Sequence, residues 1–136
     1  MLGKTRRPEM RAVIEEYAKR IGHQANVEIL EVRSPEAAIK RLDADRAAVV
    51  VLLDAAGKTL DSSAFAKWLG EIRDRSVREI IFLCGDAEGF PEELRKRAQQ
   101  KLALSAMTYS HELARVMLAE QLYRAFAILS GSPYPK

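Results

Sequence analysis

Leu102-Ala103-Leu104-Ser105-Ala106-Met107-Thr108-Tyr109-Ser110-His111, followed by residues 112–129 without glycine or proline, is the stretch that decides the fold. The pattern predicts a short apolar strand, a loop of small residues and a long helix. Ser110 suits the N-cap of that helix, and Glu112 places negative charge in the first turn, where the helix dipole favours it. Gly131 and Pro133 are typical of a helix end.

The apolar residues of this predicted helix do not form one stripe. They lie on two sides: Leu113, Val116, Tyr123 and Phe126 on one, and Leu118, Leu122, Ala125 and Leu129 on the other. A helix that is apolar on most sides has to be buried on most sides. One sheet face does not easily cover such a helix in a chain of 136 residues. We therefore expect a second copy of the chain to contact it, which predicts a homodimer.

Length and composition predict one globular domain over residues 1–136, with 48% apolar and 30% charged residues. No apolar run reaches the length of a membrane span and no signal peptide opens the chain, so we expect a cytoplasmic protein that does not contact a membrane. The single cysteine, Cys84, lies in an apolar run and is expected to be buried and reduced. The net charge of +3 permits nucleic-acid binding without arguing strongly for it.

Apolar strand-like runs alternate with amphipathic helices, which predicts an α/β fold with a mostly parallel sheet and helices on both faces. Helices are expected over Pro8 to Ile21, from Pro35 onward with Ser34 as N-cap, over Ser62 to Arg75, and over Pro91 to Gln100. Besides the run at Leu102, strands are expected over Val27 to Val32, Ala47 to Leu53, and Ile80 to Cys84.

The C-terminal third also resembles a known family. Its matching residues are Leu104-Ser105-x-Met107-Thr108, His111, Arg115-Val116 and Glu120-Gln121-Leu122-Tyr123-Arg124-Ala125. They are similar to the signature of the bacterial ribosomal RNA large subunit methyltransferase H family, pseudouridine N3-methyltransferases of the trefoil-knotted SPOUT superfamily. The resemblance extends upstream through Leu53-Asp54-x-x-Gly57-Lys58, Gly85-x-x-x-Gly89, Gly3-Lys4 and Glu15-Glu16-Tyr17-x-Lys19-Arg20. It implies a SPOUT-type trefoil-knot fold.

The start of the chain departs from this pattern. Family members usually begin with an apolar strand that ends in Gly-Lys, whereas this chain begins Met1-Leu2-Gly3-Lys4, so that strand is almost wholly absent. Either translation starts further upstream or the protein lacks a strand. A missing strand would expose a sheet edge or leave a groove beside its neighbours.

The resemblance implies that the chain binds S-adenosylmethionine. The residues that carry over as cofactor contacts are Leu53, Gly85, Leu104, Ser105, Ala106, Met107, Thr108 and Tyr109. Ligands gather at the carboxyl ends of parallel strands, where these residues would converge if the three strands are neighbours. Read without the resemblance, Gly57 and Gly85 mark turns, and Ser105 and Thr108 satisfy turn hydrogen bonds.

Three residues are candidates for catalysis through the resemblance: Arg115, His111 and Tyr134. Arg115 could contact phosphate or pair with a carboxylate, and Arg124 could pair with Glu120 one turn before it. No Cys, His, Asp or Glu cluster has the spacing of a metal site. The other basic pairs and the run Arg95-Lys96-Arg97 are expected on solvated helix faces.

The function that the resemblance implies is methyl transfer from S-adenosylmethionine to N3 of a pseudouridine in helix 69 of large-subunit ribosomal RNA, on assembled ribosomes. The alternative is a non-catalytic, degraded family member that acts as a dimeric RNA- or ribosome-binding protein. Asp86 in place of a glycine, Pro135 in place of a tail histidine and the missing strand favour that alternative. A binding domain for another small ligand would fit the periodicity alone.

Overall fold

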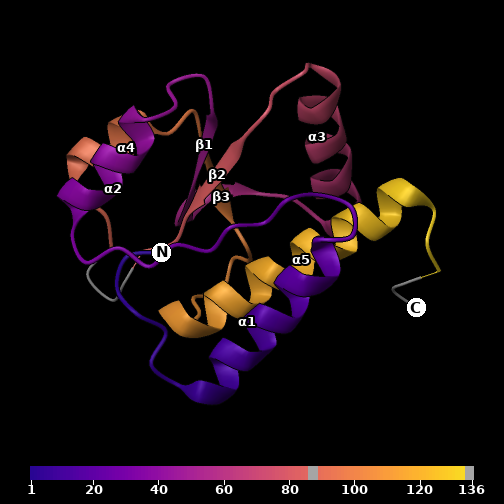
Figure 1. The fold of residues 1–136 in the computed structure, drawn as a ribbon, viewed down its shortest axis with the longest axis horizontal. Coiled ribbons are helices and arrows are strands. Elements are labelled where there is room, and N and C mark those ends of the chain that lie inside the picture. The colour runs from indigo at the N-terminus through magenta and orange to yellow at the C-terminus, as the bar shows by residue number, and fades with distance from the viewer. Residues whose placement is uncertain (86–88, 134–136) are drawn as a thin grey trace.

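The computed structural model describes residues 1–85 and 89–133, which form a parallel sheet between two layers of helices (Figure 1). The helices are α1 (Pro8–Ile21), α2 (Pro35–Asp43), α3 (Ser62–Asp74), α4 (Glu92–Arg97) and α5 (His111–Ser130). The strands are β1 (Val49–Thr59), β2 (Ile80–Leu83) and β3 (Gln100–Ala103), in the order β2-β1-β3. The predicted α/β class with a parallel sheet is confirmed.

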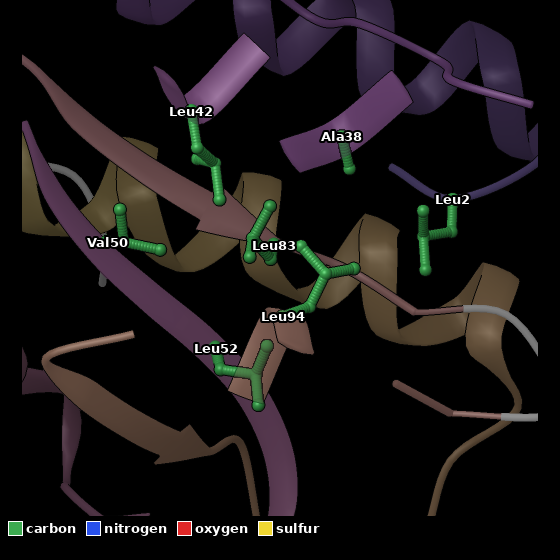
Figure 2. Close-up of a cluster of buried hydrophobic side chains, with 7 residues drawn as sticks. All are labelled: Leu2, Ala38, Leu42, Val50, Leu52, Leu83 and Leu94. Carbon is green, nitrogen blue, oxygen red and sulfur yellow. The ribbon is translucent and has the colours of Figure 1, made fainter. Parts of the chain in front are cut away.

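Each face of the sheet has its own apolar core. Helices α2 and α4 cover one face, where the buried cluster is Leu2, Ala38, Leu42, Val50, Leu52, Leu83 and Leu94 (Figure 2). Helices α3 and α5 cover the other, where the cluster is Val51, Phe65, Ala66, Leu69, Leu102 and Ala125. Alternate residues of β1 therefore contribute to opposite cores, which is why its sequence is continuously apolar.

The helix ends follow the sequence signals. Ser34, Asp61 and Ser110 each accept a hydrogen bond from the amide three residues later, at the N-termini of α2, α3 and α5. Gly131 ends α5 in the left-handed conformation, with φ of 73°. The predicted caps Ser34 and Ser110 and the predicted stop at Gly131 are confirmed.

Helix α5 is covered largely within its own chain. It packs against α1 on one side and α3 on another, and the side chains of Leu118, Ala125 and Ala127 are buried. We expected a second subunit to supply this coverage because one sheet face does not easily cover such a helix, but α1 covers part of it within the same chain. The homodimer stays a prediction, but the apolar faces of α5 no longer require it.

The segment from Val27 to Val32 is not a strand, contrary to the prediction. It forms a single parallel bridge between Val32 and Leu2, and most of its residues are exposed. A strand needs a hydrogen-bonded neighbour along its length, and Met1 to Gly3 supply too little chain to be one.

Two further boundaries differ from the prediction, both near β3. Strand β1 continues through residues 54–59, which we expected to form a loop, and its register against β3 shifts between Leu53 and Lys58. Helix α4 ends at Arg97 rather than at Gln100. The amide of Gln99 donates to the Val50 carbonyl at 3.0 Å, so the chain has already joined the sheet there.

Candidate functional site

The three strands are neighbours in the sheet, which is the condition under which we expected Leu53, Gly85 and Leu104 to converge. Leu53 pairs with Leu102, so Leu104 leaves β3 just beyond it, and Leu52 pairs with Leu83, so Gly85 leaves β2 at a similar level. Adjacent strands are about 4.8 Å apart, so these positions span roughly 10 Å across the sheet. A carboxyl edge of this kind is where α/β sheets bind ligands.

The loop after β3 offers unpaired backbone groups. Ser105 Oγ accepts a hydrogen bond from the Met107 amide at 2.9 Å, which is the turn role that the sequence suggested for it. Within the described residues, the amides of Ala106 and Thr108 donate no hydrogen bond, and Met107 is 74% exposed. The loop can therefore present backbone donors and acceptors to the edge of a flat heterocycle such as adenine.

Gly85 has a packing reason to be glycine. A Cβ at this position would lie 3.1 Å from the Phe90 ring, which packs against the apolar core beneath α4. Gly89 adopts a φ of 80°, in the left-handed region that favours glycine. Asp86, which replaces a family glycine, lies outside the described residues.

An ion pair that the sequence did not reveal joins β1 to α4. The Arg95 guanidinium lies 2.5 Å from the Asp54 carboxylate and also donates to the Phe90 carbonyl at 3.3 Å. The pKa of Asp54 lies below its ordinary value, mainly because its carboxylate accepts a hydrogen bond from the Ala56 amide and secondly because it accepts one from Arg95. Arg95 thus ties the end of the β1 ladder to the loop after β2. Arg97 pairs with Asp43, so these two arginines do not lie on a merely solvated face as predicted.

Replacing Asp54 with asparagine is expected to lower the free energy of unfolding by about 1 to 2 kcal/mol at pH 7. Because the folded-state pKa is depressed, this stabilisation is present above the ordinary value of 3.8 and is lost as pH falls through the lower folded value. Urea unfolding of both proteins at pH 7 and near pH 3 measures the difference. Glu71→Gln, at an exposed position, is the control. If Asp54→Asn lowers the free energy of unfolding equally at both pH values, the ionised Asp54 carboxylate does not stabilise the fold as described.

Arg115 is buried, with 1% of its surface exposed, and points at the N-terminal segment. Its guanidinium donates to the carbonyls of Leu2 and Gly3 and to the Thr5 hydroxyl, the last at 2.9 Å. Its Nε has no hydrogen-bond partner within the described residues. In this part of the chain, neither a carboxylate partner nor an exposed phosphate-binding surface is present at the guanidinium. Arg124, by contrast, pairs with Glu120 at 2.7 Å, as predicted.

The other two catalytic candidates are His111 and Tyr134. His111 is the first residue of α5 and is partly exposed, one helical turn before Arg115 on the same side. Its neighbour Glu112 accepts a hydrogen bond from the Arg7 amide at 3.1 Å, so the start of α5 contacts the segment before α1. Tyr134 lies outside the described residues.

A pocket of about 280 Å³, which sequence reasoning missed, begins where the third loop leaves β3. Leu104 lines it together with the start of α3 and the side of α5. Ser62 donates to the Gln121 side chain there at 2.8 Å. Among the described residues no group of three His, Cys, Asp or Glu side chains could hold a metal ion. None of the helices in this part of the chain is long and apolar enough to cross a membrane.

Comparison with known proteins gives consistent matches along the chain. Residues 1–135 match the family model described as "Predicted SPOUT methyltransferase". The chain is 42% identical over 135 residues to the ribosomal RNA large subunit methyltransferase H of Koribacter versatilis, covering 98% of this chain and 92% of the relative. It is 40% identical over 144 residues to the protein of that name from Geobacter sulfurreducens, covering 98% of this chain and 94% of that relative.

A solved structure shares the fold. The SpoU methyltransferase AviRb from Streptomyces viridochromogenes superimposes with a TM-score of 0.53, covering 93% of this chain and 57% of that protein. The sequence identity is 16%, so this likeness concerns the fold alone.

Proposed function

The chain belongs to the SPOUT methyltransferases, in the family of the ribosomal RNA large subunit methyltransferase H, and from this we propose that it methylates N3 of a pseudouridine in helix 69 of large-subunit ribosomal RNA. The observation that carries the proposal is the convergence of Leu53, Gly85 and Leu104 at one carboxyl edge of the sheet. The trefoil knot that the resemblance implies is part of the same proposal.

We propose S-adenosylmethionine as the cofactor, held by Leu53, Gly85 and the loop of residues 104–109. The residues fit this group, because the loop offers unpaired backbone amides for adenine and the neighbouring Leu53 and Leu104 side chains are apolar. The cofactor supplies an electrophilic methyl group, so the protein's task is to position the base against it and to exclude competing nucleophiles.

Of the three catalytic candidates, His111 and Tyr134 are proposed to act on the RNA, and Arg115 is proposed to act indirectly. His111 is partly exposed at the start of α5, immediately after the cofactor loop, where its imidazole could accept the N3 proton. Tyr134 would offer a ring on which a base can stack. Arg115 is buried and bonded to Leu2, Gly3 and Thr5, so it positions the N-terminal segment instead of contacting RNA.

We propose that the enzyme works as a cytoplasmic homodimer on assembled ribosomes. A dimer would place the tail of one subunit near the cofactor loop of the other, and apolar surface is exposed at Met107 in that loop and at Ile128 in the last turn of α5. Substituting an apolar residue of α5 such as Leu122 cannot test this, because Leu122 packs into the chain's own core. Sedimentation of the unmodified protein can, and a monomer at micromolar concentration would exclude the dimer.

The test of the proposed function is transfer of a radiolabelled methyl group from S-adenosylmethionine to ribosomes from a strain that lacks this modification. We expect incorporation at one position in helix 69, and none with ribosomes that already carry the methyl group. Cofactor binding by calorimetry without incorporation would support the non-catalytic alternative. Absence of both binding and incorporation would exclude the enzyme.

Gly85→Val is expected to weaken cofactor binding at least tenfold, equivalent to about 1.4 kcal/mol, because the added side chain would enter the approach to the site. Calorimetry measures the dissociation constant. The valine would also collide with Phe90, whose ring lies 3.1 Å from the place that a Cβ on residue 85 would occupy. The matched comparison is therefore Gly85→Val in a Phe90→Ala background against Phe90→Ala alone. Equal dissociation constants for the double variant and for Phe90→Ala alone would show that Gly85 does not contact the cofactor.

A further inference from the structure

The chain just before α1 carries three cationic side chains that no acidic side chain neutralises. We call residues 4–7 the basic segment. Lys4, Arg6 and Arg7 are exposed, and none of them forms an ion pair within the described residues. By contrast, Arg20 of α1 pairs with an acidic neighbour one helical turn earlier, at 3.0 Å. The basic segment is therefore a patch of positive charge that is open to a ligand.

The backbone of the basic segment is held in place through Thr5, which is only 4% exposed. Arg115 donates to the Thr5 hydroxyl at 2.9 Å, and Glu31 accepts a hydrogen bond from the Thr5 amide. Arg11 donates to the Thr5 carbonyl at 2.8 Å and pairs with Glu31 at 2.9 Å. Every polar group of Thr5 thus has a partner, and each of these partners is a charged side chain.

The burial of Thr5 determines where its two neighbours point. Burial alternates along the segment, as in an extended chain, so Lys4 and Arg6 share the solvent side. Their Cα atoms lie no more than about 7 Å apart. The carboxylates of Glu31 and Glu112 lie beside the segment, but they accept hydrogen bonds from its backbone amides. The fold therefore presents two cations at a fixed spacing to the solvent.

The basic segment passes the first turn of α5, next to the proposed site (Figure 1). The Arg7 amide donates to the Glu112 carboxylate at 3.1 Å, and His111 directly precedes Glu112. The loop of residues 104–109, which we propose to hold the cofactor, leads into the same turn. The cations thus flank the place where an RNA base would meet the methyl group.

We propose that the basic segment binds backbone phosphates of the substrate RNA, with Lys4 and Arg6 on two neighbouring phosphates. This inference rests on the proposed function and deepens it, because it names how the substrate is held at that site. Nucleic acid carries a regular row of phosphates, and lysine and arginine bind them without reading the bases. The bonds to Thr5 order the segment in advance, so little conformational entropy is lost on binding.

The test measures binding of the double variant Lys4→Ala, Arg6→Ala to large ribosomal subunits without cofactor, over a series of salt concentrations. Each lost phosphate contact reduces the slope of log affinity against log salt by about 0.7 to 0.9. Two lost contacts should reduce the slope by roughly 1.5 and weaken binding at least tenfold at about 0.1 M salt. In methyl transfer, KM for ribosomes should rise by the same factor while kcat stays within about twofold.

The matched control is Arg75→Ala, Arg78→Ala, which removes the same net charge just before β2, at the opposite end of the sheet. This pair should leave the affinity and the salt slope nearly unchanged. Equal losses in the two double variants would show that only net charge matters and would overturn the proposal. Urea unfolding should give the same midpoint for both variants as for the unmodified chain, because all four side chains are exposed.

The exchanged pair Lys4→Arg, Arg6→Lys keeps both charges and should retain most of the affinity and the salt slope. A loss as large as that of the alanine pair would contradict contacts to phosphate. The second probe is a protein-free RNA stem-loop of helix 69 at low salt, for which we expect the same change in slope. A loss confined to whole subunits would assign the segment to an acidic protein surface and overturn the contact with RNA.

The two proposals fail separately, because binding is measured without cofactor. If the unmodified chain binds subunits and stem-loop but transfers no methyl group, the proposed reaction is wrong and the salt slopes still test the basic segment. If the unmodified chain binds neither probe, the contact between the basic segment and RNA is excluded.

Discussion

Replacing Arg115 with methionine is expected to lower the free energy of unfolding by about 3 kcal/mol, a larger loss than we expect from Asp54→Asn. The methionine side chain keeps most of the volume but none of the donors. The carbonyls of Leu2 and Gly3 and the Thr5 hydroxyl would lose a charged partner in a buried place. Unsatisfied buried acceptors of this kind cost about 1 to 3 kcal/mol each, reduced by whatever water can reach them.

Urea unfolding measures this loss, and Arg115→Lys is the matched control. Lysine keeps the charge but cannot reach three acceptors with a planar fork, so we expect an intermediate loss. Amide exchange should accelerate first at Leu2 and Gly3, because their segment is held by this side chain. Unchanged stability in Arg115→Met would show that Arg115 does not hold the N-terminal segment. Arg115 would then again be a candidate for contact with RNA.

Gly57→Ala is expected to destabilise the protein by about 2 to 3 kcal/mol and to weaken cofactor binding with it. A Cβ on Gly57 would lie 2.7 Å from the Lys101 carbonyl carbon and 2.8 Å from the Leu102 amide nitrogen. These are backbone atoms of β3, so they cannot rotate away as a flexible side chain can. Relief of the collision would move β3, and with it Leu104 and the loop that follows.

Urea unfolding and calorimetry with S-adenosylmethionine measure the two effects. The control is Ala56→Gly, an exposed neighbour in the same segment, which should change stability by no more than about 1 kcal/mol. Wild-type stability and affinity in Gly57→Ala would show that the contact between β1 and β3 is looser than the structure indicates.

Elements with local signals at both ends could be predicted closely from the sequence. Helix α1 occupies the residues that Pro8 and Gly22 delimit, and α5 lies between Ser110 and Gly131. Caps and stops act through neighbouring backbone groups, so a single sequence contains them. The sequence also indicated that the residues after the three strands would share one edge of the sheet if the strands were neighbours, but the strand order itself came only from the structure.

Features that depend on distant residues could not be predicted. The Arg95 and Asp54 ion pair joins side chains 41 residues apart, and no local spacing distinguishes Arg95 from its solvated neighbour Lys96. Arg115 bonds to residues more than a hundred positions earlier. The strand that we predicted at residues 27–32 did not form for the same reason. Its apolar pattern is local, whereas a strand also needs a pairing partner from a distant part of the chain.

The contact between α1 and α5 determines when the protein can fold during its synthesis. Helix α1 is made first, yet α5, against which it packs, begins at His111. At typical elongation rates about 90 residues take roughly 5 to 20 s, so the apolar side of α1 waits that long for its partner. Strand β1 has no complete sheet during the same interval, because β3 also comes late. The nascent chain is therefore aggregation-prone until its last helix emerges, and chaperone binding should concentrate on α1 and β1.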